Sequence, residues 1–348
     1  MGLGRPCLHD FSRIRWNAII VNLIWKKNGI YWVLVFTASV YLILLFLSPV
    51  LALEGKMNNN SKEIVREVFG AGRWFPKDRV ALKTMVNGYI DEAVVEKSQG
   101  LIISAIAPHA GYVYSGKVAG YTFRAIKENI QMGFHPETVV VLGISHRGGF
   151  PGVALMDGDS IKTPLGNVVL DKNAGQLLTT KSQRIFFDYH PHRGEHSAEN
   201  LIPFVQTAMP GIKAVIGIIG DHDSKTIKDL VLSLCDLAKE KPIMVLASSD
   251  MLHDPDYTRV TRTDKQTLEI VKAMDCDKLG KEWKMSKQLF CGIGPVLVAM
   301  QFAEQQGCRK GSILYYRNSG DDFPESRGNW VVGYSSVIFV TPEQLYKK

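Results

Sequence analysis

The sequence lacks the short motifs that mark several common classes of enzyme. It has no G-x-x-x-x-G-K-[ST] phosphate loop and no well-placed G-x-G-x-x-G segment, which argues against the common nucleotide-binding sites. It also has no G-x-S-x-G motif, so a serine hydrolase would have no obvious nucleophile. Cysteine is scarce, with five residues among 348 and no C-x-x-C pair, which argues against a disulfide framework.

Positive charge is in excess, but much of it lies in one short stretch. The formal net charge is +7, and residues 1–56 hold six Lys or Arg against Asp10 and Glu54, so the remainder carries only +3. No basic stripe with interleaved aromatic residues follows, and we therefore predict no nucleic-acid binding. Hydrophobic residues make up 46% and charged residues 22%, which is typical of a globular protein with a core.

A long uncharged segment lies near the N-terminus. No Asp, Glu, Lys or Arg occurs from residue 28 to residue 53, and Lys26 and Lys27 stand immediately before this run. About 20 apolar residues are enough to cross a bilayer as a helix. Because positive charge favours the cytoplasmic side, we expect the chain after this segment to lie outside the cytoplasm.

The fate of this segment leaves alternatives open. Small or moderate residues at the −3 and −1 positions fit a signal-peptide cleavage site after Ala52, whereas an uncleaved segment would be a signal anchor. Translation from Met57 would remove the segment altogether. We divide the chain into two parts. Residues 1–56 form a basic N-terminus that contains the hydrophobic segment at 30–53, and residues 57–348 form a folded domain.

Helical and strand-like patterns alternate in this domain. The runs with helical spacing are 78–97, 117–130, 199–208, 224–239, 262–274 and 295–306. The short apolar runs typical of buried strands are 101–107, 138–142, 214–219, 243–247, 313–316 and 331–340. Continuous apolar strands separated by helices indicate a sheet that is covered on both faces. The pattern therefore predicts an α/β protein with a single three-layer α/β/α domain.

Three histidines follow predicted strands. His109, His146 and His253 each come shortly after a strand-like run. Ligand crevices of open α/β sheets lie at the carboxyl ends of strands, so these side chains are expected to converge. A single strand-end histidine usually satisfies a local hydrogen bond, but three in such places indicate a metal site or general-base chemistry.

Other polar positions are more ambiguous. Cys291 precedes a predicted helix, and a thiol near a helix N-terminus or a metal becomes a good ligand, although an inert buried thiol fits as well. His190 and His192 are interpreted as solvent-facing loop residues. The Asp-His-Asp triplet at 221–223 is interpreted as a helix cap before Ser224.

Several short motifs together resemble the Memo family, also labelled AmmeMemoRadiSam system protein B, a relative of the LigB-type non-haem iron dioxygenases. The resemblance covers roughly residues 65–340. The motifs that carry it, in the family's order, are Ala71-Gly72-Arg73-Trp74-Phe75-Pro76, Ala107-Pro108-His109-Ala110-Gly111-Tyr112, Leu142-Gly143-Ile144-Ser145-His146, Thr163-Pro164-Leu165-Gly166, Glu195-His196-Ser197, Ser248-Ser249-Asp250 and Cys291-Gly292.

The resemblance implies a LigB-like α/β/α fold and a specific site. Its metal ligands would be His109, His146 and Cys291, and the side chains lining the same pocket, as catalytic candidates, would be His196, Asp250 and His253. The cofactor would be one iron or copper ion, and the soft thiolate makes zinc an alternative. The implied activity is that of a dioxygenase-like oxidoreductase acting on an unknown small molecule. The alternative is a non-catalytic metal- or peptide-binding protein of the same fold.

Family association also implies an AMMECR-type protein and a radical SAM protein as partners. The sequence departs from the eukaryotic members at two positions. Gly294 stands where they have a histidine after the Cys-Gly pair, and a second histidine that they have near Leu201 is missing.

Overall fold

Four apolar strands form the parallel centre of the main sheet in the computed structural model, which describes residues 63–342. They lie side by side in the order β2 (Leu101–Ala107), β9 (Ile243–Ser248), β3 (Thr138–Ile144) and β8 (Lys213–Ile219). Nearly every residue of these strands is buried. Strands buried on both faces need apolar side chains at successive positions, which is why these runs were visible in the sequence.

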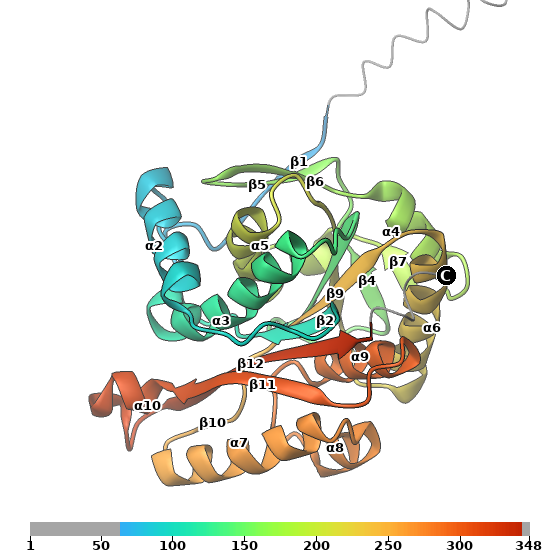
Figure 1. Ribbon diagram of the computed structural model, residues 1–348. Coiled ribbons are helices and arrows are strands. Elements are labelled where there is room, and N and C mark those ends of the chain that lie inside the picture. Colours follow the sequence, from blue (N-terminus) through green and yellow to red (C-terminus); the bar gives the residue numbers. More distant parts are fainter. Residues whose placement is uncertain (1–62, 343–348) are drawn as a thin grey trace, which may run out of the picture. The chain divides into compact units, whose positions relative to one another are not determined.

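Further strands extend this nine-stranded sheet on both sides (Figure 1). β12 pairs antiparallel with β2, and β11 and β10 pair antiparallel with β12. A separate three-stranded sheet has the order β1-β5-β6. The five added strands of the main sheet are β12 (Val331–Thr341), β11 (Gly311–Asn318), β10 (His253–Asp254), β4 (Val153–Leu155) and β7 (Ile185–Phe187). The strands of the small sheet are β1 (Val65–Glu67), β5 (Ser160–Thr163) and β6 (Gly166–Val169).

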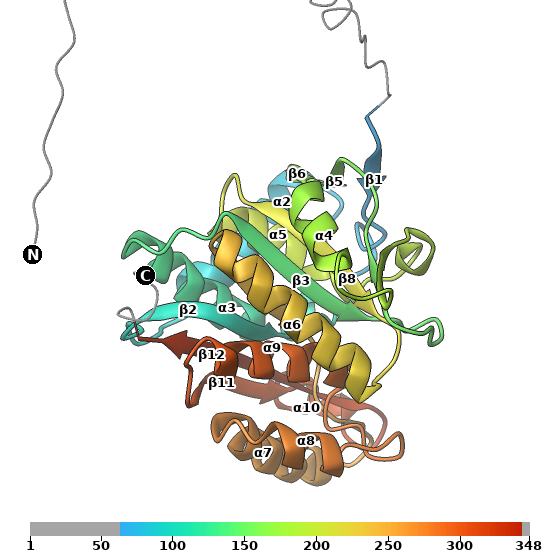
Figure 2. The same ribbon diagram turned by 90° about the vertical axis from the view of Figure 1, so that its right-hand side faces the viewer.

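Helices cover both faces of the main sheet (Figures 1 and 2). One face packs against α2 (Arg79–Glu92), α3 (Tyr112–Gln131) and α5 (Ile202–Ala208). The opposite face packs against α4 (Lys172–Thr179), α6 (Ser224–Glu240), α7 (Tyr257–Lys272), α8 (Cys276–Glu282) and α9 (Ile293–Gln305). The short elements η1 (His190–His192), η2 (Glu199–Leu201), α10 (Ser319–Asp322) and η3 (Pro324–Ser326) lie in the connections. This arrangement confirms the prediction of an α/β fold.

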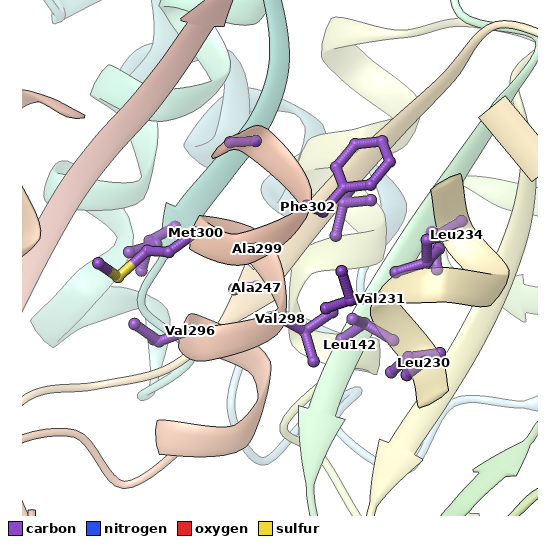
Figure 3. Packing of buried hydrophobic residues seen from close by; sticks show 14 of the residues in the cluster. Leu142, Leu230, Val231, Leu234, Ala247, Val296, Val298, Ala299, Met300 and Phe302 are labelled. Atoms are coloured by element: carbon purple, nitrogen blue, oxygen red, sulfur yellow. The ribbon is translucent and has the colours of Figure 1, made fainter. Parts of the chain in front are cut away.

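Successive side chains of the central strands enter the two different cores. In β3, Val139 and Val141 belong to the core beneath α2, α3 and α5, whereas Val140 and Leu142 belong to the opposite core. Figure 3 shows Leu142 facing Leu230 and other side chains of α6 and α9. Each fully buried side chain of this size contributes about 1.5–3 kcal/mol relative to exposure, so the sheet is held firmly from both sides.

The predicted and observed helices differ at their ends, and the helix predicted at 78–97 already ends at Glu92. The segment predicted at 117–130 begins earlier, at Tyr112, and the one predicted at 262–274 begins at Tyr257. At the second of these helices Asp256 accepts hydrogen bonds from the backbone N–H groups of Thr258 and Arg259. First turns that carry polar or exposed residues show no apolar periodicity, so the sequence pattern begins later than the helix.

Within residues 63–342, none of the helices combines the length and the apolar character needed to span a bilayer. The predicted hydrophobic segment at 30–53 lies outside the described residues, and so does the start of the predicted domain at residue 57.

Candidate metal centre

The candidate site residues meet at the carboxyl ends of three adjacent strands. His109 lies two residues after β2, Asp250 two residues after β9, and His146 two residues after β3. The last residues of β2 and β9, Ala107 and Ser248, are in register, so the segments that follow start at the same level. Parallel strands therefore bring together residues that are far apart in the sequence.

Two histidines and one cysteine converge closely enough to share a metal ion. The ligand atoms of His109, His146 and Cys291 all lie within 4.8 Å of one another. The Nε2 atom of His109 is 3.5 Å from the Sγ atom of Cys291. Nitrogen and sulfur ligands at bond lengths of about 2.0–2.3 Å and a tetrahedral angle would be about 3.6 Å apart. The residues present thus fit a transition-metal ion.

Glu195 fixes the orientation of His146. Its carboxylate lies 2.9 Å from His146 Nδ1 and accepts a 2.6 Å hydrogen bond from the His146 backbone N–H. It also accepts hydrogen bonds from the backbone N–H groups of His196 and Ser197. Because Nδ1 is engaged, Nε2 is the atom that His146 offers to a ligand. Sequence reasoning did not single out Glu195, although it stands directly before His196.

The charge on Glu195 is strongly stabilised. Burial opposes ionisation, but the hydrogen bond and charge of His146 and the backbone N–H donors lower the pKa of Glu195 to about 2. Burial likewise works against the charged form of His146, but Glu195 outweighs it and raises the pKa of His146 above its usual value. His146 is thus the more basic of the two histidines in the candidate triad.

His109 and Cys291 favour their neutral forms. Burial, together with the charge of His146, lowers the pKa of His109 to about 3. Burial and the charge of Asp250 raise the pKa of the Cys291 thiol to about 12. A nucleophilic thiolate–imidazolium pair is therefore disfavoured, which argues against a cysteine hydrolase at this site. A metal cation favours the thiolate, because it supplies positive charge next to the sulfur.

Asp250 holds the backbone of the segment that carries His109. Its Oδ1 atom accepts hydrogen bonds from the backbone N–H groups of His109, at 2.8 Å, and Ala110, at 3.2 Å. Burial nevertheless raises the pKa of this carboxyl. Asp250 thus holds the backbone of His109 in place and contributes a carboxylate next to the triad.

His196 is held in a stack of rings. Its ring lies parallel to Trp74 at a centroid distance of 4.2 Å and to His146 at 4.6 Å. Burial, together with the nearby His109 and His146, lowers the pKa of His196 to about 4. His196 also forms a second group of candidate ligand atoms with His146 and Glu195. The structure therefore brings His196 to the predicted site as a neutral imidazole.

His253 lies close to two other residues of the centre. With Asp250 and Cys291 it forms a third group of candidate ligand atoms, all within 4.8 Å of one another. Its Nε2 atom is buried and has no hydrogen-bond partner among the described residues. Buried polar atoms are normally paired, so this unpaired imidazole nitrogen indicates a place for a ligand or a water molecule.

One interpretation of the remaining histidines is wrong. His192 is not solvent-facing: its side chain is buried and its Nε2 atom lies 3.0 Å from the carbonyl oxygen of Ala154. His190 is exposed, as predicted. The predicted cap is also confirmed, because the Asp223 side chain accepts a hydrogen bond from the backbone N–H of Lys225 at the start of α6. His192 is a histidine satisfied locally by the fold.

Fold and site together define an α/β protein with a cluster of candidate metal ligands at one end of its sheet. The family described as Memo-like protein matches residues 66–338. A MEMO1 family protein of Nitrosopumilus maritimus is 31% identical over 283 residues, which cover 80% of this chain and 100% of that protein. The MEMO1 family protein Ta0237 of Thermoplasma acidophilum is 31% identical and covers 78% and 97% of the two chains. The chain belongs to the Memo family.

Among solved structures, an uncharacterized protein of Escherichia coli K12, JW3007, superposes with a TM-score of 0.43 at 14% sequence identity. The superposition covers 68% of this chain and 99% of that chain. A likeness at this level says nothing about function.

Proposed function

We propose that this protein binds one transition-metal ion through His109, His146 and Cys291. The observation that carries the proposal is the convergence of the three ligand atoms within 4.8 Å. The two histidines are braced through their Nδ1 atoms, as metal-binding histidines usually are. Two imidazoles and a soft, monoanionic thiolate favour iron or copper, with zinc as the alternative.

The activity that fits this site best is that of a metal-dependent, dioxygenase-like oxidoreductase acting on an unknown small substrate. A bound iron or copper ion would supply electron-transfer and Lewis-acid chemistry. His196 and His253 are neutral imidazoles beside the candidate ligands, and each could accept or donate a proton at a ring nitrogen. Asp250, whose carboxylate lies in the same ligand group as His253, would stabilise positive charge that develops on that ring.

The second candidate function is metal or peptide binding without turnover. The thiol of Cys291 is the observation that favours it, since a thiolate beside activated oxygen is itself oxidised. Oxygen consumption separates the two functions. If the metal-loaded protein consumes no oxygen with any of a panel of catechols and thiols, the result favours binding without turnover.

The wider organisation is part of the proposal. We infer that residues 57–348 form a single three-layer α/β/α domain of the LigB type, exported or membrane-anchored outside the cytoplasm by the segment at 30–53. The uncharged run after two lysines supports this placement. Partners would be a small molecule or peptide and, by family association, AMMECR-type and radical SAM proteins. Mass spectrometry of the mature protein tests the anchor, because an N-terminus near Leu53 would rule it out.

Metal analysis of the purified full chain tests the centre. We expect about one equivalent of iron, copper or zinc in the wild type and a loss of at least about tenfold in His109→Ala and Cys291→Ala, because each variant removes one of only three ligands. His190→Ala is the matched control, since that histidine is exposed and lies in the short η1 element. Wild-type protein that binds no more metal than the two ligand variants would contradict the proposal.

A further inference from the structure

A buried chain of polar groups runs from His109 to the segment that carries Glu195. The Nδ1 atom of His109 lies 3.0 Å from the Oγ atom of Ser248, and the Ser248 hydroxyl in turn donates to the backbone carbonyl of Ser197. His109, Ser248 and Ser197 are all buried, with at most 2% of their surface exposed. Water therefore does not compete for these hydrogen bonds, and the proton positions follow from the groups themselves.

Counting protons along this chain assigns the tautomer of His109. A serine hydroxyl has one proton, and a carbonyl oxygen can only accept. Because Ser248 donates its proton to Ser197, its Oγ atom can only accept from His109. The proton of the neutral imidazole therefore sits on Nδ1, and Nε2 carries a lone pair directed toward Cys291 Sγ, 3.5 Å away. This is the tautomer that a metal ligand needs at Nε2.

Ser197, whose carbonyl accepts the hydrogen bond from Ser248, is itself held in place by several hydrogen bonds. The Ser197 hydroxyl donates to the carbonyl of Ile144 at 2.7 Å and accepts from the Ile144 backbone N–H at 3.0 Å. Its backbone N–H donates to Glu195. The short segment 195–197 thus reaches both histidines, His146 directly through a carboxylate and His109 indirectly through Ser248.

We propose that Ser248 is a positioning residue that fixes His109 as the Nδ1–H tautomer and so prepares its Nε2 atom for the metal. The assignment rests on the proposed metal-binding function. Without the Ser248 hydroxyl, Nδ1–H keeps only the backbone of Ser248 as a partner, whereas a proton on Nε2 has an acceptor in Cys291 Sγ, 3.5 Å away. That tautomer directs a proton at the metal position and must be converted before binding.

Nitrogen NMR of the metal-free full chain, labelled with ¹⁵N-histidine, reads the tautomer directly. The protein has nine histidines, so His109→Gln identifies the His109 signals by their disappearance. We expect the Nδ1–H tautomer in the wild type and the Nε2–H tautomer, or a mixture, in Ser248→Ala. The zinc dissociation constant should rise about 10- to 100-fold in Ser248→Ala, and Ser248→Thr should restore much of both properties because it keeps the hydroxyl.

Ser233→Ala is the matched control. Ser233 is a buried serine on α6 whose hydroxyl has no partner among the described residues, so its loss should change neither the tautomer nor the zinc affinity. An Nε2–H tautomer of His109 in the wild type would overturn the assignment without any variant having to fold. So would an unchanged Nδ1–H tautomer and zinc affinity in Ser248→Ala.

The two proposals fail in different ways. A wild type that holds the Nδ1–H tautomer, loses it in Ser248→Ala and yet binds no zinc, iron or copper would contradict the metal site while supporting the role of Ser248.

Discussion

Two buried carboxylates in this protein behave in opposite ways. Glu195, at the candidate metal centre, accepts hydrogen bonds from three backbone N–H groups and from the ring of His146, and its pKa is lowered to about 2. Asp264, on α7, accepts from the Leu252 backbone N–H and the Tyr316 hydroxyl, and burial raises its pKa to about 7. Both residues are at most 3% exposed. Burial alone therefore does not decide the charge.

The difference lies in the donors and in what each carboxylate does. Backbone N–H groups and a basic imidazole favour the ionised form, and Glu195 has four such hydrogen bonds. Its permanent charge can then orient His146. Within residues 63–342 no cation hydrogen-bonds to Asp264, and its carboxylate holds the segment that leads into His253 by accepting from the Leu252 backbone N–H. A Cβ atom at Gly333 would collide with this carboxyl, so glycine is required there.

Replacing Glu195 should produce the largest effect. In Glu195→Gln one amide N–H₂ group must face N–H donors inside the protein, which we expect to cost about 3 kcal/mol of unfolding free energy. The same change frees the ring of His146 and should weaken zinc binding about 10- to 100-fold. Urea unfolding of the metal-free protein and competitive zinc titration measure the two effects.

Glu199→Gln is the control for this prediction. Glu199 is also buried, but burial raises its pKa to about 7, and it accepts a hydrogen bond from the Gly70 backbone N–H. At about pH 6 it is mostly neutral, so an amide should replace it at a cost below about 1 kcal/mol. Equal losses in the two variants would contradict the view that the charge of Glu195 is what its site stabilises.

Asp264→Asn should change how stability depends on pH. The folded-state pKa of Asp264, about 7, lies above the usual value of 3.8, so the folded protein holds this proton more tightly than the unfolded chain does. The stability that this group contributes is complete below the unfolded pKa and is lost as the pH rises toward 7. Asparagine does not titrate, so the variant should gain about 2 kcal/mol relative to the wild type between about pH 5 and pH 7.

Urea unfolding at several pH values measures this difference. The quantity to follow is the difference in unfolding free energy between wild type and variant as the pH changes, because the contributions of other titrating groups cancel in it. If the unfolding free energies of the two proteins change with pH in the same way, Asp264 is ionised in the folded state and the contrast with Glu195 does not exist.

The sequence could predict the meeting of the histidines but not what holds them. His109 and His146 follow long apolar strands, and such strands are visible because they are buried on both faces. The partners that orient the two rings, Ser248 and Glu195, stand 139 and 49 residues away along the chain. No local pattern connects residues across such separations. Cys291 could be assigned only through the resemblance to the Memo family.

The fold shows the same limit. Strands of three or four residues, such as β1, β4 and β6, carry too few positions for a period to be seen, and none was predicted. We interpreted His192 as a solvent-facing loop residue, but β4 provides a carbonyl that its ring reaches only in the folded protein. Burial of one polar side chain is decided by tertiary fit.

Asp229 provides the last contrast, because it resembles Glu195 in one respect only. It accepts hydrogen bonds from Lys225 and Ser182, which lower its pKa, but its side chain on α6 is only partly buried, with 17% of its surface exposed. Water reaches this charge in the folded protein as well as in the unfolded chain, so Asp229→Asn should cost less than about 1 kcal/mol and less still at high salt. The lowered pKa means that this small contribution is present near neutral pH and disappears as the pH falls below about 4.

Urea unfolding at low and high salt measures the Asp229 effect. A cost as large as that of Glu195→Gln would mean that the donors alone set the energy of a carboxylate. The small cost that we expect would mean that hydrogen-bond donors stabilise a carboxylate most where they replace water. The donors around the buried Glu195 therefore contribute more to stability than those around Asp229.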